Sequence, residues 1–431
     1  MTLKRKITAE LIAWKRQLDR TPLIIQGIRR CGKTTSVLSF AREHYSQVIH
    51  VDFLKSPHFK TLFEEPVSVS HLVHQLAVRC LKEPKVTAGD TILIFDNLEA
   101  CPRARETFKP FKDDGRFDVI GIRSRGDTFE DLASTNINPI GTETILPMRP
   151  LDFEEFLWAF GAKENEIAEL NTLVLEEKSI PLDDHESLCE MALEYAVVGG
   201  MPEAVTLALG DHPLGEIIAL QKDILATCRD DITAHVTGKV QTKALALLEM
   251  LPRAMRQSSA EVMRSLGVRR YLYKDIANVL EAHGLIDRCQ HLTKRELPLF
   301  AYAQPNDFKV FPSDTGLCHA ILASQNECCS QPYTDQNYAL LETLIANSRS
   351  KMSRPLYYGD KDDQVFWVRY MGKAVPLVLD MANITTMPPE IREHLNANPD
   401  GLVIRTNLDN IHRSGNILTV PLYLLFLLNK M

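Results

Sequence analysis

Residues 27–34 have the composition and spacing of a phosphate-binding loop. Gly27, Gly32, Lys33 and Thr34 fit the pattern G-x-x-x-x-G-K-[ST] within the segment GIRRCGKT. Glycines let backbone N–H groups converge on phosphate oxygens, and the lysine reaches the β- and γ-phosphates. An apolar run, PLIIQ, precedes the loop and a helical run, SVLSFAREHY, follows it, as such a site requires. The sequence therefore predicts an ATP site whose candidate binding residues are Gly27, Arg29, Arg30, Cys31, Gly32, Lys33, Thr34 and Thr35.

A second apolar run, TILIFD, ends in Asp96. In nucleotide sites of this kind, a carboxylate at the end of a neighbouring strand and the hydroxyl of the loop hold Mg²⁺, the carboxylate usually through water. We therefore expect Mg²⁺ to accompany ATP, with Thr34 and Asp96 as its protein ligands.

The residue after Asp96 makes hydrolysis a weaker prediction than binding. ATPases of this broad class place a glutamate there to polarise the attacking water, whereas this chain has Asn97. Asparagine orients a water molecule but cannot accept its proton. Glu99 replaces the missing base only if its loop turns the side chain inward. The catalytic candidates are Asn97, Glu99, Arg123 and Ser124.

Short apolar runs between Pro22 and Met148 supply the elements that position these residues. They are continuous rather than alternating, which is typical of strands covered on both faces, and they are separated by longer mixed segments. This pattern predicts an α/β domain with a parallel sheet whose strands are PLIIQG, VIHVDF, TILIFDN, FDVIGIRS and TETILPM.

The rest of the chain divides into three further segments. Acidic residues and leucines at helical spacing follow residue 163, and the segment VVGGMPEAV marks a turn before another helix. Helices at 244–257, 259–266 and 271–282, followed by a strand, are typical of a winged helix-turn-helix. A helix at 337–351 and several strands then form another α/β unit, ending in a buried strand or short helix, VPLYLLFLL. We expect domains at 1–160, 161–235 (a helical lid or linker), 236–322 (winged helix) and 323–431.

Composition excludes several classes of protein. The 431 residues are 45% hydrophobic and 24% charged with a net charge of −7, which is ordinary for a globular chain and excludes disordered, collagen-like and membrane-embedded bodies. The N-terminus lacks the apolar run of a secretory signal. Nine cysteines without a CxxC pair favour reduced thiols. We therefore expect a cytoplasmic protein with no membrane partner. His50, His71 and His74 lie near apolar runs, where packed or surface positions are expected.

Eight segments, in order, resemble a family of bacterial and archaeal ATP-binding proteins that join an AAA-like ATPase domain to a restriction-endonuclease-like domain of unknown function. The segments are GIRRCGKTT, ILIFDNLEACPRA, LPMRPLDFEEFLWAFG, VVGGMPEAV, DILATCRDDI, FKVFPSDTGL, LYYGDKDDQVFWVRYMGKAVPLVLD and GNILTVPLYLLFLL. The resemblance covers nearly the whole chain. It implies that the phosphate loop and Asp96 keep their roles.

Several positions depart from the family pattern. The polar sensor segment, usually Thr-Gly-Ser, is Ile122, Arg123 and Ser124, and Gly141 is followed by Thr142 where a basic residue is expected. Arg123 and Arg125 are stand-ins for the arginine that neutralises transition-state charge, although strand-end arginines more often have structural roles.

The endonuclease-like domain departs further. Its carboxylate and lysine positions hold Gln364, Val365 and Phe366, then Val378, Leu379 and Asp380, and only Glu342 matches. A solvated turn explains Asp360, Asp362 and Asp363 better than a displaced acidic cluster does. Because metal-dependent phosphodiester cleavage needs these carboxylates, we expect a PD-(D/E)XK-like domain without activity.

Three functions remain open. The first is an ATP-held switch with weak or absent hydrolysis. The second is an active ATPase, completed by Glu99 or by a residue from another subunit of a homo-oligomer, and coupled to DNA or a protein partner. The third is a DNA-binding winged helix with a structural nucleotide, contacting phosphates through Arg264, Arg269, Arg270 and Lys274.

Overall fold

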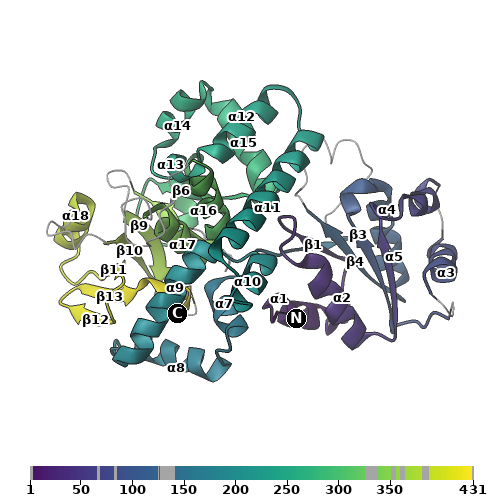
Figure 1. The fold of residues 1–431 in the computed structure, drawn as a ribbon, viewed down its shortest axis with the longest axis horizontal. Coiled ribbons are helices and arrows are strands. Elements are labelled where there is room, and N and C mark those ends of the chain that lie inside the picture. Colours follow the sequence, from purple (N-terminus) through teal and green to yellow (C-terminus); the bar gives the residue numbers. More distant parts are fainter. Residues whose placement is uncertain are drawn as a thin grey trace. The chain divides into compact units, whose positions relative to one another are not determined.

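The computed structural model describes residues 3–65, 68–81, 85–124, 126, 141–325, 338–350, 356–359, 365–380 and 388–429. The chain forms two compact units. The first unit consists of Met1–Arg149 with Ala282–Gly284, and the second consists of Pro150–Glu281 with Leu285–Met431. Both units are drawn in Figure 1.

The first unit is built on a five-stranded parallel sheet with the order β2-β3-β4-β1-β5. Its strands are β1 (Leu23–Gln26), β2 (Gln47–Asp52), β3 (Thr91–Asp96), β4 (Asp118–Arg123) and β5 (Thr144–Pro147). All five coincide with the predicted apolar runs, so the α/β parallel-sheet prediction is confirmed. The α-helices in the described part of this unit are α1 (Ile7–Lys15), α2 (Lys33–His44), α3 (Val69–Cys80), α4 (Pro102–Glu106) and α5 (Phe108–Asp114).

The central strands are buried because helices pack on them. β3 and β4 are buried at every position, and side chains of β3 join an apolar cluster with α3 and α5 that includes Phe95, Leu72 and Phe111. This explains why the strands are continuous rather than alternating in hydrophobicity. Since the strands are parallel, the residues that follow β1, β3 and β4 lie along one edge of the sheet.

The second unit combines helices with an eight-stranded mixed sheet of order β12-β13-β11-β10-β9-β8-β6-β7. Its strands are β6 (Ile286–Leu292), β7 (Ala303–Pro312), β8 (Tyr357–Tyr358), β9 (Val365–Tyr370), β10 (Lys373–Leu379), β11 (Val403–Asn407), β12 (His412–Ser414) and β13 (Ile417–Pro421). Its helices are α7 (Phe153–Ala159), α8 (Glu164–Leu175), α9 (Leu182–Val198), α10 (Pro202–Leu209), α11 (Leu214–His235), α12 (Gly238–Glu249), α13 (Leu251–Ala254), α14 (Ser259–Leu266), α15 (Arg270–Ala282), α16 (Thr315–Ser324), α17 (Tyr338–Ser350) and α18 (Pro389–Ala397).

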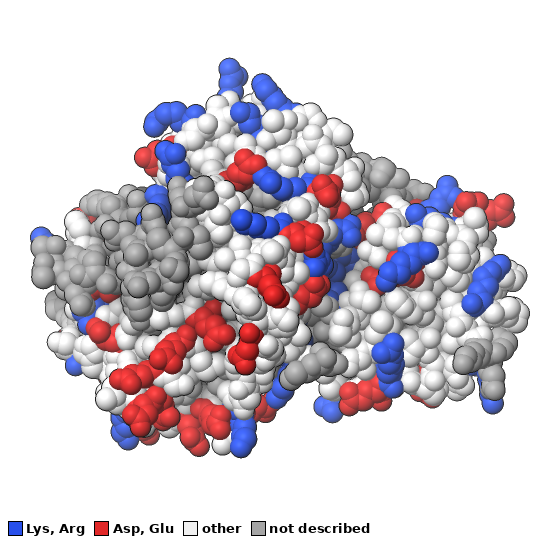
Figure 2. Space-filling model, in the orientation of Figure 1, with Lys and Arg blue, Asp and Glu red and all other residues white. Residues whose placement is uncertain are grey.

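Acidic side chains gather over α8 and α9, in agreement with an acidic helical segment after residue 163 (Figure 2). The predicted turn after α9 is also present, with Gly199 at a φ of 72°. Among the described residues, no helix is both long and apolar enough to cross a membrane.

One of two local predictions needs correction. The single helix expected at 244–257 is divided into α12 and α13 around Met250, because Pro252 near the start of α13 has no N–H to continue the α12 hydrogen-bond ladder. The run VPLYLLFLL, expected as a buried strand or short helix, is buried and contains parts of both: β13 ends at Pro421, and two short 3₁₀ helices follow, Leu422–Leu424 and Leu427–Asn429.

The hairpin of β6 and β7 belongs to the same sheet as the strands that follow residue 356. The segments at 236–322 and 323–431 therefore share one sheet. The division of the chain into four domains stays a prediction.

Candidate nucleotide-binding site

The phosphate loop joins β1 to α2 along a close backbone path. Arg30 and Gly32 have positive φ angles of 65° and 94°. A Cβ on Gly27 would lie only 1.9 Å from the carbonyl oxygen of Met148, so the loop depends on glycine for its approach to the end of β5. Gly32 precedes α2 and has no side chain to cap it, which leaves the N–H groups of the first helical turn for an anion.

Lys33 is held against the loop that precedes it. The side chain is 7% exposed, and its Nζ donates hydrogen bonds of 2.8 Å to the carbonyl oxygens of Gly27 and Ile28. An ammonium group has three donors, so one remains for a phosphate oxygen. These two bonds preorganise the positive charge at the mouth of the loop.

The two expected metal ligands are in direct contact. Thr34 Oγ1 donates a 2.8 Å hydrogen bond to Asp96 Oδ2, and His50 Nε2 lies 3.4 Å from the same oxygen. Hydroxyl and carboxylate oxygens suit Mg²⁺, so this pair fits the ion. Among the described residues no group of three His, Cys, Asp or Glu side chains could hold a metal alone, so phosphate oxygens would have to complete the shell.

Asn97 is directed at the neighbouring strand. It adopts a left-handed conformation with φ of 53°, and its Nδ2 donates to Asp52 Oδ1 at 2.9 Å. Asp52 Oδ1 also accepts from the backbone N–H groups of Leu54 and Lys55. Burial alone would raise the pKa of Asp52, but the hydrogen bonds from Lys55, Asn97 and Leu54 outweigh burial and lower it. Asn97 therefore orders the end of β2, and its amide is already engaged.

Glu99 turns inward, as a replacement base would have to. It lies on a 3₁₀ turn, Leu98–Ala100, that follows the left-handed Asn97. Glu99 Oε1 accepts a hydrogen bond from Ser124 Oγ and lies 3.7 Å from the guanidinium of Arg29. The side chain is only 6% exposed, and within the described part of the chain Oε2 is buried without a hydrogen-bond partner. Glu99 thus links the phosphate loop to the end of β4.

The remaining candidates have different positions. Cys31 is fully buried, and its Sγ lies 3.6 Å from the carbonyl oxygen of Met148. Thr35 is exposed on α2. Arg123 is buried at the end of β4, paired in register with Gln26. Arg125 lies outside the described residues. The structure thus brings together the loop, Asp96, Glu99 and Ser124.

Three further residues of the site were not predicted from the sequence. Arg5 donates a 2.9 Å hydrogen bond to the carbonyl oxygen of Cys31 and so supports the loop from before α1. His50 and Asp52 lie at the end of β2, beside Asp96. The sequence did contain a signal for His50 and Asp52. The runs VIHVD and TILIFD pair as adjacent parallel strands, so their ends lie side by side. Arg5 has no local signal.

The second unit pairs the two described acidic residues of the endonuclease-like pattern with arginines. Glu342 on α17 accepts a 3.2 Å hydrogen bond from Arg256, and Asp380 after β10 lies 3.7 Å from Arg405. Asp360, Asp362, Asp363 and Gln364 lie outside the described residues.

Comparisons with known proteins address the class of the first unit. Residues 19–157 match a family described as an AAA domain, and residues 190–327 match a domain of unknown function, DUF8612. No curated protein matches the chain. With its parallel sheet and phosphate loop, the segment at 19–157 is an AAA-like P-loop domain.

Several solved structures are similar to the chain. The Walker-type ATPase PABY2304 of Pyrococcus abyssi is 14% identical, with 74% of this chain and 96% of that chain covered and a TM-score of 0.41. ORC1 of Aeropyrum pernix in complex with DNA is 14% identical, with 75% of this chain and 94% of that chain covered and a TM-score of 0.28. The RuvB Holliday junction branch migration motor of Thermotoga maritima is 14% identical, with 66% of this chain and 90% of that chain covered and a TM-score of 0.29. These scores are too low to transfer a role to any residue.

Proposed function

We propose that the first unit binds ATP with Mg²⁺ and acts as a nucleotide-held switch with slow hydrolysis. The contact between Thr34 and Asp96 beside the preorganised Lys33 carries this proposal. The loop N–H groups and Lys33 bind the phosphates, and Thr34 and Asp96 would hold Mg²⁺. The ion, when bound, neutralises phosphate charge.

The link between Arg29 and Glu99 gives the switch a physical basis. Arg29 belongs to the phosphate loop, and its guanidinium lies 3.7 Å from Glu99, which in turn accepts from Ser124. A γ-phosphate competes with Glu99 for Arg29, because both are anions. ATP and ADP therefore differ in their effect on the end of β4, as a ligand-driven change of conformation requires.

Hydrolysis is slow in this proposal because Glu99, the substitute base, is already engaged by Ser124 and Arg29. Water attacks the γ-phosphorus, the bond to the bridging oxygen breaks, and Glu99 Oε2 takes the proton of the water. Oε1 is already bonded to Ser124, which holds Glu99 in place. Asn97 cannot take the proton. An arginine from a second copy of the chain, in a homo-oligomer, would raise the rate.

Calorimetric titration of ATP into the full-length chain, with Mg²⁺ and with EDTA, tests the binding proposal. We expect one site, and about tenfold weaker binding in EDTA because the phosphate charge is then less compensated. Equal affinity in the two conditions would remove Thr34 and Asp96 from the role of metal ligands.

We also propose that the endonuclease-like part of the second unit has no nuclease activity. The pairing of Glu342 with Arg256 and of Asp380 with Arg405 supports this, because each carboxylate is compensated by a guanidinium. No cluster of carboxylates that could hold a metal is found among the described residues.

A second candidate function is DNA binding by α14 and α15 in a winged-helix arrangement. Arg264, Arg269, Arg270 and Lys274 are all exposed, and Lys and Arg side chains gather over this part of the second unit (Figure 2). Gly267, with φ of 66°, ends α14, while α15 buries its opposite face and the β6–β7 hairpin follows. This arrangement leaves the cations free to contact phosphates.

We expect fluorescence anisotropy to show duplex DNA binding that weakens as salt rises. The double variant Arg269→Ala, Arg270→Ala should lower the slope of log affinity against log salt by about 2, since each phosphate contact contributes about 0.9. Lys163→Ala, an exposed lysine on the acidic side of the unit, is the matched control. Binding that is absent or independent of salt would reject this function.

A further inference from the structure

Three side chains with metal-ligating atoms meet at one carboxylate oxygen of the first unit. Asp96 Oδ2 accepts a 2.8 Å hydrogen bond from Thr34 Oγ1, and His50 Nε2 lies 3.4 Å from the same oxygen. The other oxygen of Asp96, Oδ1, accepts a 2.9 Å hydrogen bond from the backbone N–H of Asn97. The nucleotide proposal uses Thr34 and Asp96 but assigns no role to His50.

The register of the sheet places His50 beside Asp96. In the parallel pair of β2 and β3, His50 lies opposite Ile94, and Asp52 lies opposite Asp96. Side chains alternate between the two faces along each strand, so His50 and Asp96 lie on the same face of the sheet, two residues apart in register. The side chain of His50 is 29% exposed. The imidazole is thus held by a strand rather than a loop, and it remains partly exposed beside the carboxylate.

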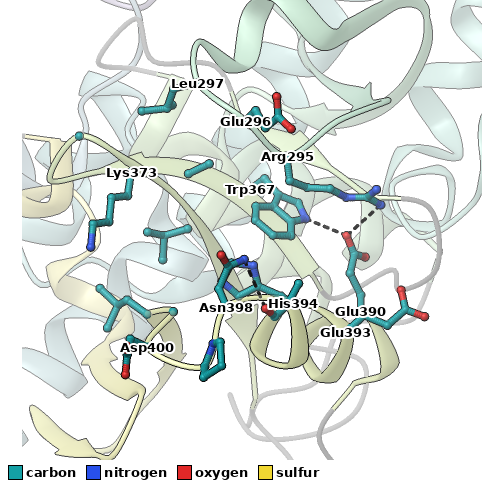
Figure 3. Close-up of a pocket in the computed structure, with 17 residues that line it drawn as sticks. Arg295, Glu296, Leu297, Trp367, Lys373, Glu390, Glu393, His394, Asn398 and Asp400 are labelled. Carbon is teal, nitrogen blue, oxygen red and sulfur yellow. Dashed lines mark hydrogen bonds and ion pairs between the residues drawn. The ribbon is translucent and has the colours of Figure 1, made fainter.

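The three atoms that meet here can all bind a cation, because a hydroxyl oxygen, a carboxylate oxygen and a neutral imidazole nitrogen each carry a lone pair. A buried carboxylate of the second unit, shown in Figure 3, differs in this respect. Glu390 Oε1 accepts a 2.8 Å hydrogen bond from Trp367 Nε1 and lies 3.3 Å from Arg295. Indole and guanidinium groups only donate hydrogen bonds. Of these two carboxylates, only Asp96 therefore has neighbours that can share a metal ion with it.

The separations between these atoms are close to those of neighbouring ligands on one ion. In an octahedral complex with metal–ligand distances of about 2.1 Å, adjacent ligand atoms lie about 3.0 Å apart. The separations from Asp96 Oδ2 are 2.8 Å to Thr34 Oγ1 and 3.4 Å to His50 Nε2. When Thr34 and Asp96 hold an ion, a small movement of the imidazole therefore adds a nitrogen ligand.

A nitrogen ligand selects the kind of ion. Mg²⁺ binds oxygen ligands and gives up its water reluctantly. Imidazole nitrogen binds divalent transition-metal ions more strongly, with affinity rising from Mn²⁺ to Co²⁺. Thr34 and Asp96 offer oxygens that both kinds of ion accept, whereas His50 offers a nitrogen from which the transition-metal ion gains more. His50 therefore distinguishes the two kinds of ion.

We propose that His50 is a third protein ligand of the metal that accompanies ATP, and that the site prefers a divalent transition-metal ion, Mn²⁺ or Co²⁺, to Mg²⁺. This inference rests on the proposed nucleotide site, in which Thr34 and Asp96 hold the metal. His50 adds one nitrogen to their two oxygens, and phosphate oxygens and water occupy the other positions.

Pulsed electron paramagnetic resonance of the full-length chain with Mn²⁺ and ATP tests direct ligation. We expect a magnetic coupling between Mn²⁺ and a histidine nitrogen, assigned by isotopic labelling of histidine, and its loss in His50→Gln. Glutamine keeps an N–H donor for Asp96 but has no imidazole nitrogen. His74→Gln, at an exposed position on α3, makes the same change elsewhere in the unit and should keep the coupling. Absence of the coupling from the unchanged chain with ATP bound would overturn the proposal, whether or not His50→Gln folds.

Calorimetric titration of ATP at saturating Mg²⁺, Mn²⁺ or Co²⁺ tests the preference. We expect the unchanged chain to bind ATP at least about tenfold more tightly with Co²⁺ than with Mg²⁺, since even groups that only support a metal ligand contribute about tenfold or more. This ratio should fall toward one in His50→Gln and persist in His74→Gln. Equal ATP affinity with the three ions, or an unchanged ratio in His50→Gln, would overturn the role of His50 and leave ATP binding intact. Absence of ATP binding with every ion would reject the nucleotide site as well.

Discussion

Replacing Lys33 with alanine is expected to weaken ATP binding by about 100-fold, the upper end of what a hydrogen bond from a charged donor contributes. The structure gives the reason, because Lys33 Nζ is fixed by the carbonyl oxygens of Gly27 and Ile28 and has one donor left for a phosphate. Calorimetric titration with ATP and Mg²⁺ measures the effect.

Lys109→Ala is the matched control for this variant. Lys109 is exposed on α5 in the same unit, so its loss should leave ATP affinity unchanged. The thermal midpoint of Lys33→Ala must be recorded as well, because Lys33 also stabilises the loop. A folded Lys33→Ala protein that binds ATP as tightly as the unchanged chain would move the nucleotide site away from residues 27–34.

Replacing Glu99 with glutamine is expected to lower single-turnover phosphate release by about 100-fold while ATP affinity changes little, since general bases contribute about 100-fold or more. Glutamine preserves an acceptor for Ser124 Oγ but cannot take a proton from water. The retained affinity distinguishes loss of a base from collapse of the loop.

Glu106→Gln provides the control, since Glu106 is exposed on α4 and is not part of the proposed nucleotide site. The two variants make the same chemical change in the same unit. If Glu99→Gln releases phosphate at the rate of the unchanged chain, Glu99 is not the base. If Asn97→Ala then abolishes release, the asparagine suffices to orient the water.

The strands of the first unit were predictable because each is a continuous apolar run closed by a turn. The same pattern predicted the positions of the phosphate loop and Asp96. The loop follows β1 and Asp96 ends β3, and these parallel strands end at one edge of the sheet. The contact between Thr34 and Asp96 agrees with the predicted metal pair, whose role remains a prediction.

The direction of Glu99 was not predictable. It depends on the left-handed backbone of Asn97 and on the 3₁₀ turn after it, and local sequence does not determine whether such a turn folds toward the sheet edge.

ATP binding by the phosphate loop underlies both the proposed switch and the proposed hydrolysis. A single-turnover experiment with radiolabelled ATP and Mg²⁺, recording bound nucleotide and released phosphate together, tests this for the unchanged chain and for Lys33→Ala. We predict tight binding with slow phosphate release by the unchanged chain, and loss of both in Lys33→Ala. Nucleotide bound equally by the two proteins, or by neither, would contradict ATP binding by residues 27–34.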